Sequence, residues 1–501
     1  MKHAVLINNS HIENFSVRSI GSYLKHKGFS VSTIHYEGKK DNVFNLLPAE
    51  SLKLLAEYCN NCDLVGISLL TTHQLKRSIQ INNYLKGKIK AKIIWGGVPV
   101  ICDPQFYLHH ADYICIGEGE TVMVDLLEGK NLNEIKGIGY KSKSGKFIIN
   151  SIPNLLDLNK TPIPSLDLDD GFILRGRKMI PLKNELPRSL STYSIISVKG
   201  CPYSCSYCLN SKLKTIFSKK GPLIRKVEIS RIIKELEWAK THIPHLRRVV
   251  FDDDDFFLRP EHEIEDLLKT YSERIDLPIF YIQTNIRHVT ESKVHLLTKS
   301  GIQLRYLKIG LQSASSRINR VVFSRNFNKD IFIKRLKMLV SNDIRIMLDV
   351  ISDNPYEMLP DKYEALLFYH DMLKEIKGLS TIDLPIKMYD HKLMFYPGAE
   401  LYAMAKKDGV ITDNYINNVL LKRNTLRKHE EDIDTDAFVI TLLNKVFRKE
   451  RFSQLAYSII KIMRIKLIFS LIVRFNIVKN CYALYKIKFF ERLFKKINTT
   501  D

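Results

Sequence analysis

The stretch GCPYSCSYC, residues 200–208, decides most of what the sequence predicts about the fold. It places Cys201, Cys205 and Cys208 at Cys-x3-Cys-x2-Cys spacing, so that three thiolates share one short loop. Three thiolates can bind three corners of a four-iron, four-sulfur (4Fe–4S) cube and leave its fourth iron open to a small molecule, whereas electron-transfer clusters are usually closed by a fourth Cys. A zinc knuckle is the alternative, but zinc takes four ligands, usually from paired elements, and no such pair follows nearby.

An aromatic residue, Tyr207, directly precedes the last of these cysteines and offers its face beside the open iron. The three cysteines together with this residue resemble the radical S-adenosylmethionine (radical SAM) superfamily. The resemblance implies that Cys201, Cys205 and Cys208 are the metal ligands and that Tyr207 lies against S-adenosylmethionine. It also implies the reaction, in which a reduced cluster cleaves S-adenosylmethionine to a 5′-deoxyadenosyl radical that takes hydrogen from an unactivated position of a substrate.

Length and composition predict an ordinary globular protein of about three domains. The chain has 501 residues, of which 45% are hydrophobic and 26% charged, as in typical folded domains. Its start, MKHAVLINNSHIENF, lacks the basic stretch and long apolar run of a signal peptide, which predicts a cytoplasmic location. Eight cysteines in such a chain do not indicate a disulfide scaffold, and a reducing compartment favours free thiols and a cluster. The pair Cys59 and Cys62 has no partner pair nearby, so we expect it to pack before a buried strand.

Residues 1–150 alternate between apolar runs and helical periodicity. The expected strands are HAVLI, FSVSTIH, LVGISLL, KIIWGG and DYICIG, and a helix is expected over residues 16–27 with Gly28 as its stop. Strands that alternate with helices imply a parallel sheet covered on both faces, so we predict a Rossmann-like, doubly wound α/β domain. In such sheets ligands bind beyond the carboxyl ends of the strands, where polar residues and glycines are therefore informative.

The strand ends of this domain carry small and polar residues in a particular order. They are Ser68, Thr71, Gly96, Gly97, Gly117, Glu118, Gly119 and Glu120. The order GIS-x-x-T, WGG and D-x-x-x-x-GEGE resembles the cobalamin-binding domain that precedes many radical SAM domains. The resemblance implies that these residues bind cobalamin; a domain that keeps the fold and has lost the cofactor is the alternative.

One motif of cobalamin domains is altered in this chain. Many such domains supply a cobalt-ligating His in Asp-x-His-x-x-Gly after the first strand, where this chain has Asn9, Ser10, His11, Ile12, Glu13 and Asn14. A metal-bound His normally has a partner that fixes its tautomer, and the Asp that would do so is replaced by Asn9. We therefore expect His11 to be an ordinary loop residue and cobalamin to bind without it.

Residues 151–192 are rich in Pro, Asp and Lys and predict an extended linker. From 193 to about 410 strands again alternate with helices. The expected strands are YSIISVKG, RRVVFDDDDFF, LPIFYIQTN, LRYLKIGLQS and IRIMLDVISDNP, and residues 227–242 are expected to be helical. This rhythm resembles the partial (β/α)6 barrel of radical SAM enzymes, with chemistry at the carboxyl ends of the strands. The stretch PGAELY, residues 397–402, resembles the one that closes this domain.

The strand ends of this core supply the residues that the resemblance assigns to S-adenosylmethionine. Asp253 and Asp254, in FDDDDF, match the position that binds its amino group, and a carboxylate suits an ammonium. Gln312 and Ser313 match contacts to the nucleoside or the methionine carboxylate, and Arg325 matches a further carboxylate contact. A solvated acidic loop and a surface Arg are the alternatives.

Residues 411–501 form a basic C-terminal segment in which helices are expected. Residues 437–501 hold 14 Lys and Arg against three Asp and Glu, within a net charge of +23 for the chain. No apolar run there is long enough to span a bilayer, because the run is interrupted by Lys461, Arg464, Lys466 and Arg474. We expect a helical cap with a solvated basic face; peripheral contact with the inner face of a membrane is the alternative. Nucleic acid is not expected, because the aromatic residues fall in the apolar stripe.

Together these patterns predict a cobalamin-dependent radical SAM enzyme that methylates an unactivated carbon or phosphorus centre of a small molecule or lipid. We expect a 4Fe–4S cluster, S-adenosylmethionine and cobalamin as cofactors, and a one-electron donor such as flavodoxin or ferredoxin as partner. The alternatives are radical cyclisation or rearrangement without methyl transfer, and a non-catalytic cobalamin-binding sensor. A methylthiotransferase is not expected, because neither extra N-terminal cluster cysteines nor a small C-terminal β-barrel is evident. Substrate contacts follow no generic pattern, so the substrate itself is not predicted.

Overall fold

The computed structural model describes residues 1–9, 12, 14–36, 46–376, 378–380, 385–416, 419, 435–447 and 453–464. The chain divides into two compact units. The first comprises Met1–Gln283, His295–Arg305 and Phe395–Arg423, and the second comprises Thr284–Val294, Tyr306–Met394 and Asn424–Asp501. This division places the first part of the predicted core in one unit with the predicted N-terminal domain.

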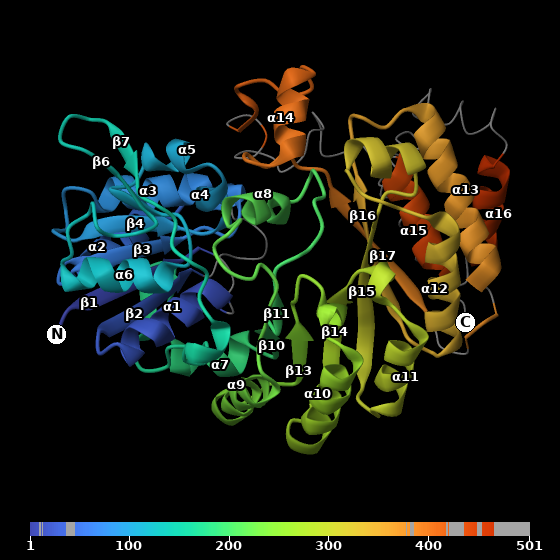
Figure 1. Cartoon of the computed structure of the whole chain (residues 1–501), viewed down its shortest axis with the longest axis horizontal. Coiled ribbons are helices and arrows are strands. Elements are labelled where there is room, and N and C mark those ends of the chain that lie inside the picture. Colours follow the sequence, from blue (N-terminus) through green and yellow to red (C-terminus); the bar gives the residue numbers. More distant parts are fainter. Residues whose placement is uncertain are drawn as a thin grey trace. The chain divides into compact units, whose positions relative to one another are not determined.

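A nine-stranded sheet organises the N-terminal part of the first unit (Figure 1, blue to green). Its order is β7-β6-β5-β4-β3-β1-β2-β8-β9. The strands are β1 (His3–Asn8), β2 (Ser30–Tyr36), β3 (Leu64–Ser68), β4 (Lys92–Gly96), β5 (Tyr113–Cys115), β6 (Ile138–Lys141), β7 (Phe147–Ile149), β8 (Gly171–Arg175) and β9 (Lys178–Pro181). Strands β1 to β5 pair in parallel, which confirms the predicted α/β class and the five expected strands.

Helices connect and cover these strands. They are α1 (Phe15–His26), α2 (Ala49–Cys59), α3 (Leu75–Leu85), α4 (Val98–Cys102), α5 (Pro104–Leu108), α6 (Gly119–Glu128) and α7 (Leu182–Ser189), with short turns η1 (Thr72–Gln74) and η2 (Leu158–Lys160). Helix α1 begins where the Asn14 side chain accepts a hydrogen bond from the Ser16 N–H, which satisfies one of the free donors of a helix start. Consecutive residues of β1 to β4 are buried, so both faces of the sheet are covered.

The predicted linker is more structured than the sequence indicated. Residues 171–181 form the antiparallel pair β8 and β9, and β8 pairs in parallel with β2, Thr33 opposite Gly171. The linker therefore extends the N-terminal sheet by two strands. Frequent Pro residues indicated irregular backbone but gave no sign of this pairing, because strand partners distant in sequence leave no local pattern.

The rest of the first unit begins the core. Its elements are β10 (Thr192–Ile195), β11 (Val198–Lys199), α8 (Leu209–Ile216), β12 (Arg225–Lys226), α9 (Ile229–His242), β13 (Arg248–Phe251), η3 (Phe256–Leu258), α10 (Glu261–Arg274), β14 (Ile279–Thr284) and α14 (Glu400–Lys407). β10 pairs in parallel with β13, and β13 with β14, while β11 and β12 form a short antiparallel pair. The single strand expected over YSIISVKG is thus broken between β10 and β11.

The second unit contains three further parallel strands. Their order is β15 (Leu304–Gln312), β16 (Ile346–Ser352) and β17 (Ile386–Lys392), of which β17 was not singled out from sequence. The unit also contains η4 (Ile286–His288) before these strands, and η5 (Ile318–Val322), α12 (Lys329–Ser341), α13 (Leu359–Ile376), α15 (Thr435–Phe447) and α16 (Ser453–Met463) between and after them. Helix α11 (Glu291–Lys299) has residues in both units. The two units each contribute strands in the βα rhythm predicted for the core.

The described part of the C-terminal segment is helical, as expected. Helix α15 packs against α16, α13 and β17. The Asn444 side chain accepts a hydrogen bond from the Met388 N–H and donates one to its carbonyl, so this helix is fastened to strand β17. Within the described ranges no helix is both long and apolar enough to cross a membrane. Lys466, Arg474 and the segment to residue 501 lie outside the described residues.

Candidate functional site

The three cysteines lie together on the loop that joins β11 to α8. Cys201, Cys205 and Cys208 are free and partly exposed, and Cys208 directly precedes the first turn of α8, where the helix dipole favours a thiolate. Burial raises the pKa of Cys201 to about 12 and that of Cys208 to about 11. These two thiols therefore need a positively charged partner, such as iron, to ionise at neutral pH.

The three cysteines of the loop could hold a cluster. Cys201, Cys205 and Cys208 are free thiols, and a 4Fe–4S cube takes one iron to each thiolate. Within the described residues, no three His, Cys, Asp or Glu side chains are arranged around one point that a single metal ion could occupy.

Gly200, the first residue of the motif, is required by the backbone. Its φ is +105°, and a Cβ atom there would lie 2.1 Å from the Leu223 carbonyl oxygen. Only Gly accepts both conditions without displacing the backbone. The loop therefore starts at a fixed turn packed against the approach to β12.

Asp253 holds the backbone just before this loop. It is completely buried, and its carboxylate accepts hydrogen bonds from the Ser197 N–H, the Ser197 hydroxyl at 2.7 Å and the Val198 N–H at 2.8 Å. Burial raises the pKa of Asp253 to about 7, although these donors and the nearby Arg259 act to lower it. Its side chain is fully engaged inside the protein, so its assignment to the amino group of S-adenosylmethionine stays a prediction that this geometry does not support.

Asp254 contacts the cysteine loop itself. Its carboxylate accepts hydrogen bonds from the Gly200 N–H at 2.8 Å and from the Asn210 side chain, and it is partly exposed. Of the two predicted carboxylates, Asp254 is the one with surface left to meet an ammonium group. Asp252, by contrast, is exposed and accepts a hydrogen bond from the Tyr281 hydroxyl at 3.0 Å.

Arg259 also supports the backbone before the cysteine loop. Its guanidinium is buried and donates to the Ser197 carbonyl at 2.7 Å, the Val227 carbonyl at 2.6 Å and Glu263 at 2.9 Å. Asp253 and Arg259 thus hold the two sides of Ser197, at the break between β10 and β11. Sequence reasoning missed Arg259, because nothing local marks an Arg that bonds to distant carbonyl groups.

Replacing Asp253 by Ala should destabilise the protein, while replacing Asp252 by Ala should not. The first change leaves two backbone N–H groups and the Ser197 hydroxyl without their buried acceptor, and we expect the free energy of unfolding to fall by about 2–4 kcal/mol. The second alters an exposed residue of the same acidic run and should change it by less than about 0.5 kcal/mol. Chemical denaturation of both variants measures the difference; equal stabilities would show that Asp253 does not support the loop.

Glu118 lies among four donors that belong to the cysteine-loop region and the linker. It accepts hydrogen bonds from Lys199 at 2.9 Å, from two nitrogens of Arg225 at 2.9 and 2.8 Å, and from the Leu156 N–H at 2.7 Å. Burial alone would raise the pKa of Glu118, but Lys199 and Arg225 outweigh it and hold the pKa at about 2. Lys199 directly precedes Gly200. The GEGE motif of the N-terminal sheet is therefore ion-paired to the start of the cysteine loop.

Two further residues, Leu401 and Lys214, form hydrogen bonds with the loop between its cysteines. The Leu401 N–H donates to the Ser206 carbonyl at 2.9 Å, so the start of α14, in the PGAELY stretch, is bonded between the second and third cysteines. The Lys214 ammonium donates to the Pro202 carbonyl at 2.9 Å and to the Ser204 hydroxyl at 3.1 Å. The loop is thus held along its whole length, as precise positioning of a cluster requires.

The remaining residues predicted to bind cobalamin lie where the prediction placed them, at the carboxyl ends of β3, β4 and β5. Several also have structural roles. Gly97 has φ +115°, and a Cβ atom there would lie 1.9 Å from the Leu69 carbonyl oxygen. Thr71 caps η1 together with Gln74, and Glu120 accepts a hydrogen bond from Ser19 at 2.6 Å. His11 lies outside the described residues.

Gln312, Ser313 and Arg325 come together in the second unit, at the carboxyl end of β15. Arg325 donates to the Leu311 carbonyl at 2.8 Å and to the Gly310 carbonyl. Gln312 has φ +67°, next to a break in the register with β16. A non-Gly residue in this strained conformation often marks a functional site. Ser313 is buried and accepts a hydrogen bond from the Ser315 N–H at 3.1 Å.

Cys59 and Cys62 are buried, as expected. The Cys62 thiol donates to the Cys59 carbonyl at 3.1 Å, and the hydrogen bond with Cys62 together with burial raises the pKa of Cys59. This pair packs before β3 and belongs to the sheet core, separate from the cysteine loop in the fold.

Two family models match the chain. The model of the B12 binding domain matches residues 9–127, and that of the radical SAM superfamily matches residues 195–365. Each match covers the strand-end residues described above for that part of the chain, including all three cysteines of the loop in the second case.

Two curated relatives are methyltransferases by name. An uncharacterized methyltransferase of Pyrococcus horikoshii is 26% identical over 272 residues, which is 51% of this chain and 53% of that protein. The cobalamin-dependent radical SAM methyltransferase TokK of Streptomyces tokunonensis is 22% identical over 336 residues, 64% of this chain and 46% of that protein. The chain thus spans about half the length of the curated relatives it matches.

Solved structures share the fold. The cobalamin-dependent S-adenosylmethionine radical enzyme OxsB, with aqua-cobalamin and S-adenosylmethionine bound, matches with a TM-score of 0.62 at 17% identity, over 82% of this chain and 62% of that chain. The radical S-adenosylmethionine methyltransferase TsrM of Kitasatospora setae, with tryptophan and an S-adenosylmethionine analogue, matches with a TM-score of 0.61 at 15% identity, over 81% and 76%.

Proposed function

The chain belongs to the radical SAM enzymes that carry a B12-binding domain, and on this basis we propose that it is a cobalamin-dependent methyltransferase. The proposal includes three cofactors: a 4Fe–4S cluster on Cys201, Cys205 and Cys208, S-adenosylmethionine, and cobalamin at the strand ends of the N-terminal sheet. When bound, the reduced cluster supplies the electron that cleaves S-adenosylmethionine, and cobalamin supplies the methyl group.

One observation favours the proposed enzyme over the non-catalytic sensor. Glu118, in the motif assigned to cobalamin, is ion-paired with Lys199, the residue before the cysteine loop. Methyl transfer from one cofactor to a substrate radical made with the other requires the two sites to be held at a fixed distance and orientation. A sensor whose cluster domain had lost its role would not need this partly buried ion pair, nor the support that Asp253 and Arg259 give the loop.

The residues proposed to bind S-adenosylmethionine differ in side-chain exposure and in backbone conformation. Asp254 keeps exposed surface beside Gly200 and is the better candidate for the ammonium group. Gln312 supports the proposal through its strained backbone at the end of β15. Tyr207, partly exposed between two cysteines, is proposed to cover the ligand and exclude water from it.

The substrate is proposed to be a small molecule, with a lipid as the alternative. The tryptophan bound to TsrM shows that a protein of this fold takes a small molecule. A lipid substrate and peripheral membrane contact rest on the basic C-terminal segment, most of which lies outside the described residues. A one-electron donor such as flavodoxin or ferredoxin is proposed to reduce the cluster.

The products of an anaerobic incubation distinguish the candidate reactions. We expect reconstituted protein with cobalamin, S-adenosylmethionine and a strong one-electron reductant to form both S-adenosylhomocysteine and 5′-deoxyadenosine, because one molecule reloads the cobalamin and another makes the radical. Liquid chromatography with mass spectrometry measures both. 5′-Deoxyadenosine alone, with a substrate present, would indicate cyclisation or rearrangement, and neither product from fully loaded protein would support the sensor.

A further inference from the structure

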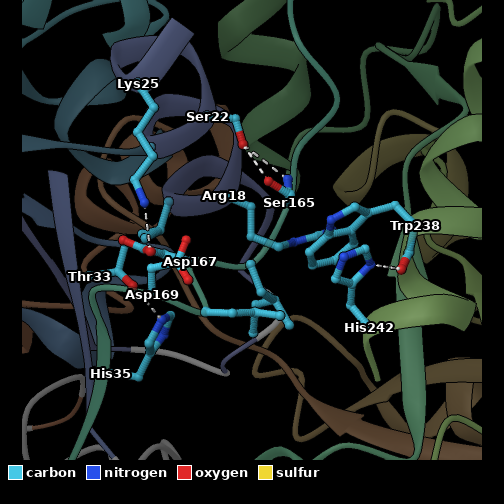
Figure 2. Close-up of a pocket in the computed structure, with 14 residues that line it drawn as sticks. Arg18, Ser22, Lys25, Thr33, His35, Ser165, Asp167, Asp169, Trp238 and His242 are labelled. Atoms are coloured by element: carbon cyan, nitrogen blue, oxygen red, sulfur yellow. Dashed lines mark hydrogen bonds and ion pairs between the residues drawn. The ribbon is translucent and has the colours of Figure 1, made fainter. Parts of the chain in front are cut away.

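Two cavities of the structure differ in the charge of their lining. The cavity of about 320 Å³ in Figure 2 is lined by Arg18, Lys25, Asp167 and Asp169, so that two cations face two carboxylates. Lys25 donates to Asp167 at 2.7 Å, and Arg18 is paired with the buried Glu235 at 3.3 Å. The charges around this cavity are therefore balanced within the protein.

A second cavity, of about 230 Å³, is lined by residues of the second unit and carries an excess of positive charge. Its described lining includes Arg287, Arg325 and Arg335 and contains neither Asp nor Glu. Asn285, which directly follows β14, also lines it. Ligands of parallel α/β sheets bind beyond the carboxyl ends of the strands. The cavity is smaller than the ~300–1,000 Å³ of pockets for drug-sized ligands, so it suits a single small group.

Two of these guanidinium groups bond only to backbone carbonyls among the described residues. Arg335 donates to the Ile286 carbonyl at 2.8 Å. Arg325 donates to the Leu311 carbonyl at 2.8 Å and to the Gly310 carbonyl. A guanidinium has five N–H donors, so both side chains keep donors for a ligand. Both residues line the cavity and are partly exposed, so a ligand in the cavity can reach them.

The other polar side chains of the lining also supply donors. The side-chain oxygens of Asn285 and Asn328 accept hydrogen bonds from the N–H groups of Arg287 at 3.1 Å and Ile331 at 2.9 Å. Within the described part of the chain their NH₂ groups have no partner. Asn328 caps the start of α12, where the helix dipole favours negative charge. Donors therefore come from three segments: the end of β14, the approach to α12, and α12 itself.

This arrangement is complementary to a phosphate group. Guanidinium groups bind phosphate and carboxylate oxygens through paired hydrogen bonds, and such charge-assisted bonds are stronger than neutral ones. Donors from three segments suit a tetrahedral group, whose oxygens point in several directions, better than a planar carboxylate. Phe327 and the exposed Ile331 also line the cavity. They provide apolar surface for the part of a ligand that carries the phosphate.

We infer that this cavity binds the phosphate group of a small molecule that has an apolar body. The site is independent of the reaction proposed above, because Arg287 and Arg335 are not among the residues assigned to any of the three cofactors. Arg325 is the exception, since it is also assigned to the carboxylate of S-adenosylmethionine. That ligand is therefore included in the test as a competitor.

Titration calorimetry of the full-length protein with phenyl phosphate, at fixed ionic strength, measures the binding. Phenol has the same ring without the phosphate and should bind about tenfold more weakly or worse. Inorganic phosphate should also bind more weakly than phenyl phosphate, because it lacks the ring that would contact Phe327 and Ile331. Saturating S-adenosylmethionine should leave the affinity for phenyl phosphate unchanged.

The Arg335→Gln variant tests the guanidinium. Gln keeps a donor for the Ile286 carbonyl but removes the charge, so phenyl phosphate binding should weaken by about 10- to 100-fold in a folded protein. Arg320→Gln removes the same charge from an exposed position of η5. It should leave the affinity unchanged, which controls for the general attraction of anions to a chain of net charge +23.

Thermal unfolding verifies the fold of each variant. Arg335→Lys is the second variant at this position; it keeps the charge without the planar fork and should weaken binding by a smaller factor. The inference is overturned if phenyl phosphate fails to bind, binds no better than phenol or inorganic phosphate, or is displaced by S-adenosylmethionine. Equal affinities of the Arg335 variants and Arg320→Gln would overturn it as well.

Discussion

Replacement of Cys201, Cys205 and Cys208 together by Ala is expected to abolish the iron cluster and S-adenosylmethionine cleavage. Anaerobically reconstituted natural protein should hold about four irons per chain, and the variant almost none, because three thiolates are the proposed ligands of the cube. The loss should be complete rather than graded, since the open iron that binds S-adenosylmethionine exists only in an assembled cluster. Iron analysis, the visible spectrum and 5′-deoxyadenosine formation measure it.

The chain supplies a matched control in its other close cysteine pair. Cys59 and Cys62 are buried before β3, so their replacement by Ala removes two thiols without touching the loop. We expect this double variant to keep its iron and its activity. Equal iron in the triple and the double variants would refute the assignment of the loop cysteines as ligands.

Replacement of Glu118 by Gln is expected to have the second largest effect. It leaves Lys199 and the buried Arg225 without their carboxylate, and breaking a buried pair by removing one partner costs about 3–5 kcal/mol. The start of the cysteine loop would lose its connection to the N-terminal sheet. We expect lower stability and slower formation of 5′-deoxyadenosine, with a visible spectrum that shows the cluster still present.

The contribution of Glu118 to the unfolding free energy should depend on pH. Its pKa in the folded protein is about 2, below the ordinary 4.5, so its stabilisation is fully present above about pH 4.5 and is lost as the pH falls through 2. This shift corresponds to about 3 kcal/mol. The difference in unfolding free energy between the natural protein and Glu118→Gln should therefore shrink between pH 5 and 2.

Glu120 provides the control for this prediction. It belongs to the same motif and is buried, but its carboxylate accepts a hydrogen bond from the neutral Ser19 hydroxyl. Glu120→Gln should keep the Ser19 contact and change stability and activity much less. If the two variants behave alike in denaturation, in 5′-deoxyadenosine formation and across pH, Glu118 does not position the cysteine loop.

Most helices and strands could be predicted from the sequence, because the spacing of apolar residues that marks them lies within each element. The apolar runs gave β1 to β5, the helix ending near Gly28 was found as α1, and the strand before the acids was found as β13. β8 and β9 were missed for the opposite reason, since their partner β2 is distant in sequence. β17 was missed because its sequence, IKMYDHK, contains polar residues that dilute the strand signal.

The position of the three cysteines on one loop could be predicted from the sequence, whereas the environments of the carboxylates could be predicted only in part. Spacing alone identified the loop, but it could not tell Asp253 from Asp254, which differ in burial and partners rather than in sequence. Glu118 was assigned to a ligand because it lies at a strand end, while its four donors come from residues 156, 199 and 225. Lys199, beside Gly200, was visible in sequence, but its partner was not.

The pairing of β8 with β2 has a consequence for how the chain is synthesised. β2 is made early, but the strand that covers its outer side contains Gly171–Arg175 and leaves the ribosome much later. Until then β2 presents an open edge, which is a template for unwanted strand pairing. A fragment that stops at residue 150 would keep this edge exposed permanently. A fragment meant to fold alone should therefore extend beyond β9, and a chaperone is most useful to the nascent chain before that point.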